Sequence, residues 1–157
     1  MENKRFKKYF ILIFIALTIF LLDQIIKLYI ASTMYNYSKV LVNGVLNLTY
    51  TKNTGGAFGI GKNSLIGFII INSIIIGLLI YYVVKDHKIK LCSLISISLR
   101  IGGGLGNLAD RIFRGYVIDY LDINPLFKYP VFNFADICIV LGSILLLGSL
   151  IKDKDRL

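Results

Sequence analysis

Four long apolar runs dominate the pattern of hydrophobic and polar positions along the chain. They cover residues 9–31, 65–84, 91–112 and 131–151, and the first becomes amphipathic toward its end. Each run is close to the ~20 residues that a helix needs to cross a bilayer. The pattern predicts an all-α integral membrane protein with four transmembrane helices, organised as a single domain over residues 1–157.

A different pattern fills the segment between the first two runs. Two short stretches with strand-like composition, 40–42 and 45–50, flank Asn43-Gly44, which is a strong hairpin signal. A segment rich in turn residues follows. We therefore expect a small β-element over about 40–58 that lies on the membrane surface, with a short interfacial segment at 33–39 before it.

Composition and charge support a membrane protein and indicate its orientation. The chain is 56% hydrophobic, which is too apolar for a soluble domain of this size. Its net charge of +9 does not indicate a nucleic-acid partner, because the basic residues gather beside the apolar runs, at 4–8, 85–90 and 152–156. Dense basic segments mark the cytoplasmic side, so we expect both termini to be cytoplasmic.

This topology sorts the carboxylates. Five aspartates fall at or near the outer ends of the first, third and fourth helices: Asp23, Asp110, Asp119, Asp122 and Asp136. Carboxylates beside a bilayer are costly to desolvate and usually face a bundle interior or a polar cavity where they have a use. Their convergence on the outer rim predicts a functional site there.

Other catalytic groups are missing from the sequence. The single histidine, His87, lies in a basic link, and Cys92 and Cys138 lie in apolar runs without metal-ligand spacing. Neither a Cys/His dyad, a Ser-His-Asp triad nor an H-E-x-x-H motif can be assembled. We expect no metal and no cofactor, and carboxylate chemistry remains.

Two aspartates that share one proton can hydrolyse a peptide bond. One carboxylate takes a proton from water while its protonated partner polarises the carbonyl. We interpret Asp119 and Asp136 as such a pair, meeting across two helix ends, while Asp122 stays open as a rival partner if this segment is helical. An alternative of similar weight is that the aspartates only form salt bridges with Lys27, Arg111 and Arg114.

Further polar and small residues surround the expected site. Asn107 lies one turn before Asp110 and Arg111, and Asn133 could cap the fourth helix or orient Asp136. Gly102 and Gly106 have the G-x-x-x-G spacing that lets helices pack closely. Arg100 lies roughly 13 Å into the third helix, near mid-bilayer, and has no evident role.

Five polar blocks, in this order and on this topology, resemble those of the lipoprotein signal peptidases, also called signal peptidase II. The blocks are Asp23-Gln24-Ile25-Ile26-Lys27, Asn53-Thr54-Gly55-Gly56-Ala57-Phe58, Gly106-Asn107-Leu108-Ala109-Asp110-Arg111, Val117-Ile118-Asp119-Tyr120-Leu121-Asp122 and Phe132-Asn133-Phe134-Ala135-Asp136. Each block alone is weak evidence, but five in order are specific, and the resemblance spans nearly the whole chain.

The resemblance implies an aspartic endopeptidase of the bacterial cytoplasmic membrane. Its substrate would be a diacylglyceryl-modified prolipoprotein, cut just before the lipidated cysteine at the extracytoplasmic face. The resemblance implies that Asp119 and Asp136 are the catalytic dyad. It also implies that ten residues support the site or bind substrate: Asp23, Lys27, Asn53, Gly55, Gly106, Asn107, Asp110, Arg111, Asn133 and Ala135.

The resemblance carries further expectations about structure and partners. It implies an extracytoplasmic β-cradle, a short interfacial helix, contact with membrane lipids, and inhibition by cyclic peptides such as globomycin; we expect a monomer. Two residues depart from the family pattern, Gly56 in place of alanine and Arg100 in place of an apolar residue. The alternative function is a small proton-coupled transporter or channel subunit, which predicts acids spread through the depth of the bilayer.

Overall fold

The computed structural model describes residues 2–35, 37–55, 64–86 and 88–154. Within them lie four helices, α1 (Glu2–Thr33), α2 (Leu65–Lys85), α3 (Leu91–Arg114) and α4 (Phe134–Lys154), and three strands, β1 (Ser38–Val42), β2 (Leu46–Asn53) and β3 (Val117–Asp122). All four helices are long and apolar enough to cross a membrane. The expected four-helix membrane bundle with a small sheet is confirmed.

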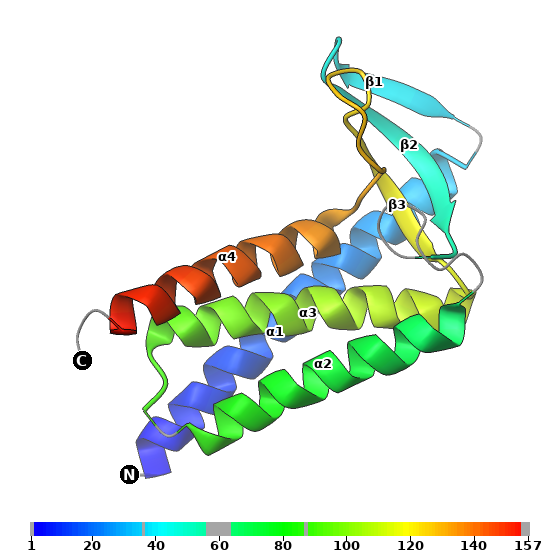
Figure 1. Cartoon of the computed structure of the whole chain (residues 1–157). Coiled ribbons are helices and arrows are strands. Elements are labelled where there is room, and N and C mark those ends of the chain that lie inside the picture. Colours follow the sequence, from blue (N-terminus) through cyan, green and yellow to red (C-terminus); the bar gives the residue numbers. More distant parts are fainter. Residues whose placement is uncertain (1, 36, 56–63, 87, 155–157) are drawn as a thin grey trace.

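Helix α3 is the centre of the bundle. It lies between α1, α2 and α4, and the small sheet sits at one end, away from the end where α1 begins and α4 finishes (Figure 1). In its most apolar stretch 61% of residues are buried inside the protein, against 11–17% for the other three helices. Functional groups on the buried face of α3 are therefore enclosed by the other helices.

Glycines explain why the neighbours can approach α3 so closely. A methyl group at Gly102 would lie 2.7 Å from the carbonyl oxygen of Ala16 on α1. A methyl group at Gly104 would lie 3.3 Å from Ile76 on α2. The G-x-x-x-G spacing of Gly102 and Gly106 thus serves helix packing, as predicted.

The sheet is antiparallel, in the order β1-β2-β3. The predicted hairpin forms its first two strands, with Gly44 at a φ of 70° in the turn. The expected β-element over 40–58 begins slightly earlier, at Ser38, and its second strand ends at Asn53; residues 56–58 lie outside the described part of the chain.

Strand β3 is the feature that differs most from the sequence-based picture. The segment around Asp119 was expected at a helix end, but it pairs with β2 and places Thr51 opposite Asp119. Phe132 also bridges to Leu121, with backbone hydrogen bonds of 2.8 and 3.0 Å. This pairing keeps residues 131–133 extended, so α4 begins at Phe134 rather than at 131.

The remaining differences concern the ends of elements. Helix α1 includes the basic residues before Tyr9, and α3 continues to Arg114, where Gly115 ends it in the left-handed conformation. The expected interfacial segment at 33–39 contains the last residue of α1, a turn and the start of β1 instead. Within the described ranges there is no fifth helix, and residues 56–63 lie outside them.

Candidate active site

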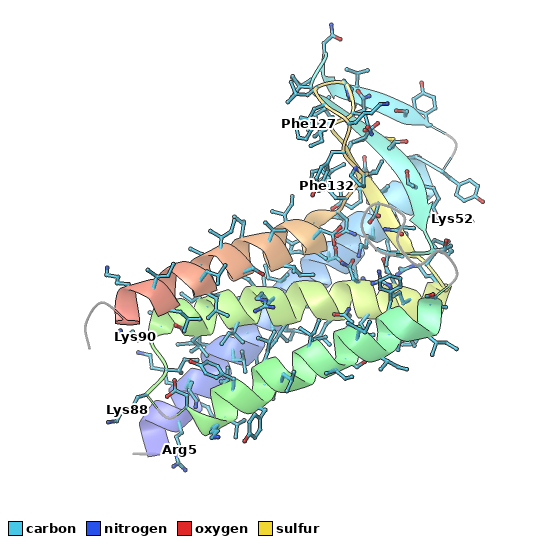
Figure 2. All side chains as sticks on the ribbon, viewed as in Figure 1. Arg5, Lys52, Lys88, Lys90, Phe127 and Phe132 are labelled. Atoms are coloured by element: carbon cyan, nitrogen blue, oxygen red, sulfur yellow. The ribbon has the colours of Figure 1, made fainter. Side chains whose placement is uncertain are left out.

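The site forms where the sheet-side ends of α1, α3 and α4 meet β2 and β3. Each element brings polar side chains to this end of the bundle, on the sheet side marked in Figure 2 by Lys52 and Phe132. Asp119 comes from β3 and is 2% exposed. Asp136 comes from the first turn of α4, so the two carboxylates reach the site from separate elements.

Asp119 is held by two asparagines. Asn53 Nδ2 donates to its Oδ2 at 2.8 Å, and Asn133 Nδ2 donates to its Oδ1 at 2.6 Å. Burial raises the pKa of Asp119 to about 7, and the negative charge of Asp136 acts in the same direction, while the two asparagine bonds oppose the shift. A carboxyl group with this pKa can hold or release a proton near neutral pH.

Asp136 is held at the start of α4. Asn107 Nδ2 donates to its Oδ1 at 2.8 Å, and the backbone N–H of Asn133 donates to its Oδ2 at 3.1 Å. In return, Asn133 Oδ1 accepts from the backbone N–H of Asp136, so Asn133 caps α4 as predicted. Asn133 therefore donates to both carboxylates, Asp119 through its amide and Asp136 through its backbone.

A buried lysine, Lys27, contacts Asn107. Lys27 Nζ is 2.8 Å from Asp23 Oδ2 and 3.0 Å from Asp110 Oδ2, and all three side chains are fully buried. It also donates to Asn107 Oδ1 at 2.9 Å. With its oxygen occupied by Lys27, Asn107 must turn its NH₂ group toward Asp136.

The salt-bridge alternative is therefore correct for some of the aspartates only. Asp23 and Asp110 form ion pairs with Lys27, and Asp110 also pairs with Arg114. Among described residues, no ion pair includes Asp119 or Asp136. These two carboxylates are held by neutral amides and a backbone N–H instead.

Asp122 is separated from this group by the geometry of β3. Successive side chains of a strand alternate between faces, so residues three apart lie on opposite faces. Asp122 is partly exposed and accepts hydrogen bonds from Asn124. The rivalry between Asp122 and Asp136 depended on a helix that the structure does not contain.

Asp119 and Asp136 line the same cavity, which has a volume of about 210 Å³. Asn53, Asn107 and Arg111 line its polar side, while Val131, Ile139 and Val140 contribute apolar wall. The cavity has room for several water molecules, each of which occupies about 30 Å³ in the liquid. It can therefore hold water beside both carboxylates and next to an apolar surface.

Three comparisons with known proteins identify the family of this chain. The family model described as signal peptidase (SPase) II matches residues 15–152. Lipoprotein signal peptidases of Staphylococcus aureus strains JH9 and Newman are 40% identical over 154 residues, covering 96% of this chain and 94% of theirs. The chain belongs to the signal peptidase II family.

Solved structures support the same assignment. A bacterial membrane enzyme determined by the in meso method at 2.3 Å resolution has a TM-score of 0.84 and 36% identity, covering 92% of this chain and 90% of that one. A second, at 1.9 Å resolution, has a TM-score of 0.82 and 38% identity, covering 90% and 93%. This chain thus shares its fold with bacterial membrane enzymes of known structure.

Other residues expected in a signal peptidase II site support its frame. Arg111 donates to the carbonyl oxygens of Asn107 and Gly55, both at 3.2 Å, so it ties the loop after β2 to α3. The N–H of Gly55 donates to Asn53 Oδ1 at 2.9 Å, which orients the amide that holds Asp119. The departure at Gly56 lies outside the described residues.

Two other backbone positions connect α1 to the rest of the site. The N–H of Ala135 donates to Asp23 Oδ1 at 3.2 Å, so the start of α4 is tied to α1. Gly106 leaves room for the Asp23 carboxyl, which a methyl group at this position would overlap. Asp23 on α1 therefore contacts both α3 and α4 without lining the cavity.

Gln24 and Arg114 also contribute to the site, although Arg114 was expected only as a salt-bridge partner and Gln24 was not singled out. Gln24 Nε2 donates to the carbonyl oxygen of Gly106 and to Asp110 Oδ1, and Arg114 donates to Gln24 Oε1 at 3.0 Å. The signal was present, because Gln24 lies inside the first polar block and Arg114 is four residues after Asp110. Arg114 offsets the charge of Asp110 and Gln24 helps to orient it, both at Oδ1, while Lys27 holds Oδ2.

Two further features concern metal binding and Arg100. Among the residues that the structure describes, no group of three or more His, Cys, Asp and Glu side chains is placed to hold a metal ion. Arg100 lies against Gly142 of α4, and its Nε is buried without a hydrogen-bond partner. Arg100 is distant along α3 from the site, and the structure does not explain its presence.

Proposed function

We propose that this protein is an aspartic endopeptidase that removes the signal peptide from diacylglyceryl-modified prolipoproteins, cutting before the lipidated cysteine. Membership of the signal peptidase II family supports the reaction class. The observation that carries the assignment of residues is the shared cavity, into which Asp119 and Asp136 both project without an ion-pair partner among described residues.

In this proposal Asp119 and Asp136 share one proton and act as a unit. The ionised carboxylate takes a proton from the cavity water, and the protonated one donates a hydrogen bond to the scissile carbonyl. The water oxygen attacks the carbonyl carbon, and a proton then passes to the leaving amine as the C–N bond breaks. A pKa of about 7 for Asp119 supports proton sharing at neutral pH.

The surrounding amides act by position. Asn53 and Asn133 donate to the two oxygens of Asp119, and Asn107 donates to Oδ1 of Asp136, so these bonds orient both carboxylates. Lys27 in turn fixes Asn107. Such preorganisation is worth several kcal/mol, because reacting groups held at attack distance avoid an entropic cost during the reaction.

The place of the site in the bundle fits a lipid-anchored substrate. Acyl chains on the substrate cysteine would keep the scissile bond at the membrane surface, and we propose that the cavity, lined by residues of α3, α4, β2 and β3, lies at that depth. The basic segments at the other end of the bundle favour cytoplasmic termini and an extracytoplasmic site. We further propose that the enzyme acts as a monomer among membrane lipids and is blocked by globomycin-type cyclic peptides that occupy the cavity.

A proton-coupled transporter fits the structure less well. A relay needs titratable groups through the depth of the bundle. The carboxylates within the apolar spans, Asp23, Asp110 and Asp136, all lie in the cluster at the sheet end. These three acids therefore form one cluster, and the described parts of the apolar spans place no further acid along a path toward the opposite end of the bundle.

Conservative variants test the proposal. We expect Asp119→Asn and Asp136→Asn each to lower cleavage of a lipidated prolipoprotein by about 10²–10⁴-fold, the range for loss of general acid–base catalysis. Asp122→Asn is the matched control and should cleave normally, because Asp122 lies on the opposite face of β3. A gel-shift assay with purified, monodisperse variants measures all three. Normal cleavage by either of the first two would refute the dyad.

A further inference from the structure

A second cavity lies at the end of the bundle opposite the site. It is a groove of about 490 Å³ between the beginning of α3 and the end of α4. This volume falls within the range of small-molecule pockets. Lys88 and Lys90 mark this end of the bundle in Figure 2, far from Phe132 at the sheet end. Its lining includes Lys90, Cys92, Ile144, Leu145, Gly148 and Lys152.

The floor and walls of this groove are suited to a hydrocarbon chain. A buried hydrogen bond of 2.7 Å between Ser93 and Ser149 ties α3 to α4 at its base, so the polar atoms there already have partners. Ile144 is 59% exposed and Leu145 42% exposed, and both face the groove. A methyl group added at Gly148 would meet no heavy atom within 4 Å, so this glycine leaves space open.

The rim of the groove is positively charged. Lys90 immediately precedes α3, and Lys152 lies in the last turn of α4. The first turn of α3 has no side-chain cap, so its N-terminal dipole adds to the attraction for an anion. In the adjoining segments 85–90 and 152–156, basic residues outnumber acidic ones. An apolar groove under a basic rim is complementary to an anionic phospholipid, whose phosphate would contact the rim and whose acyl chain would lie in the groove.

We propose that this groove binds one anionic phospholipid, with the phosphodiester between Lys90 and Lys152 and an acyl chain over Ile144, Leu145 and Gly148. The lipid comes from the leaflet opposite the candidate active site. Lys90 and Asn107 are separated by about 25 Å along α3 at the usual helical rise, so the lipid contacts none of the cavity residues. The proposal therefore stands independently of the peptidase mechanism.

Native mass spectrometry of the purified full chain tests this binding. The protein is exchanged into detergent with equal amounts of dioleoylphosphatidylglycerol and dioleoylphosphatidylcholine, and retained lipid is counted per chain. We expect one phosphatidylglycerol to be retained in preference to phosphatidylcholine. Lys90→Gln combined with Lys152→Gln should weaken this retention on the order of tenfold, since each basic group near a membrane surface contributes to anionic-lipid binding.

A second variant tests the groove without changing charge. Gly148→Leu fills the open space and should also reduce phosphatidylglycerol retention, whereas Gly77→Leu, at a helix position equally free of neighbours, should not. The charge control is Lys7→Gln combined with Lys88→Gln, which removes two exposed lysines at the same end that do not line the groove. Both controls should retain the lipid as the wild type does.

Several results would overturn the proposal. Equal retention of both lipids by the wild type would make the groove an ordinary lipid contact. Retention that falls as much in the Lys7/Lys88 control as in the Lys90/Lys152 variant would show a diffuse charge effect. If Gly148→Leu changes the oligomeric mass and leaves lipid retention intact, the groove is a contact between copies of the chain instead.

Discussion

The hydrogen bond from Asn53 to Asp119 offers a sensitive test of the candidate dyad. Asn53 Nδ2 donates to Asp119 Oδ2 at 2.8 Å, and this bond stabilises the ionised form of Asp119. It lowers a pKa that burial and Asp136 raise to about 7. In Asn53→Ala the stabilising donor is lost, so the pKa of Asp119 should rise further.

The size of the shift follows from the strength of the bond. A hydrogen bond to a charged group contributes about 1.5–3 kcal/mol, and cavity water should replace part of it, so we take a net loss of about 1 kcal/mol. This corresponds to about 0.7 pKa unit. At pH 8 the protonated fraction of Asp119 would then rise from about one in eleven to about one in three.

The pH dependence of cleavage measures this change. If catalysis needs one protonated carboxyl in the pair, activity of the wild type should fall as the pH rises through about 7, because Asp119 then loses its proton. In Asn53→Ala the alkaline limb should move up by about 0.7 unit. The maximal rate should also drop, since Asn53 orients Asp119; the midpoint of the limb, not the rate, is the readout.

Asn47→Ala is the matched control. Asn47 lies on the same strand and pairs with Asp122 rather than with Asp119. Its removal should leave the midpoint unchanged. An alkaline limb that stays in place in Asn53→Ala, or moves to lower pH, would refute the assignment of that limb to Asp119.

Two further predictions concern the frame behind the dyad, and thermal unfolding in detergent micelles checks both. Lys27→Met should destabilise the protein by about 3–5 kcal/mol and abolish cleavage, because the carboxylates of Asp23 and Asp110 lose their shared cation inside the bundle. If the variant unfolds at the wild-type temperature, the ion pairs among Lys27, Asp23 and Asp110 do not stabilise the fold. Gly106→Ala should cost about 1–3 kcal/mol, since its methyl group overlaps the Asp23 carboxyl. Gly77→Ala, which meets no neighbour, is the control, and equal unfolding temperatures for the two alanine variants would contradict the packing argument.

Hydrophobic patterning alone determines the membrane bundle. Four apolar runs of about 20 residues leave the chain little choice in a bilayer, where only helices satisfy every backbone polar group internally. The hairpin at Asn43-Gly44 is equally local, because its short turn needs the positive φ that Gly44 supplies. Asn133 capping α4 could also be read from its spacing to Asp136.

Strand β3 could not be read in the same way. Residues 117–122 follow a helix closely, and a strand depends on a partner far away in sequence, here β2. Whether Asp122 competes with Asp136 depends on this assignment, since a helix puts residues three apart on one face and a strand puts them on opposite faces. The five family blocks selected Asp136, but they gave no physical reason for the choice.

The division between paired and unpaired aspartates is likewise a property of the tertiary structure. The sequence determined that several carboxylates, one lysine and two arginines gather at one end of the bundle. The pairs Lys27–Asp23 and Arg114–Asp110 are four residues apart on one helix, so local spacing already permits them. Only the packing of α1 against α3 decided that Lys27 also pairs with Asp110, leaving Asp119 and Asp136 to face the cavity. The physical reason is that this pair depends on a distance of 3.0 Å between side chains of different helices, which close approach at Gly106 permits and which no local pattern encodes.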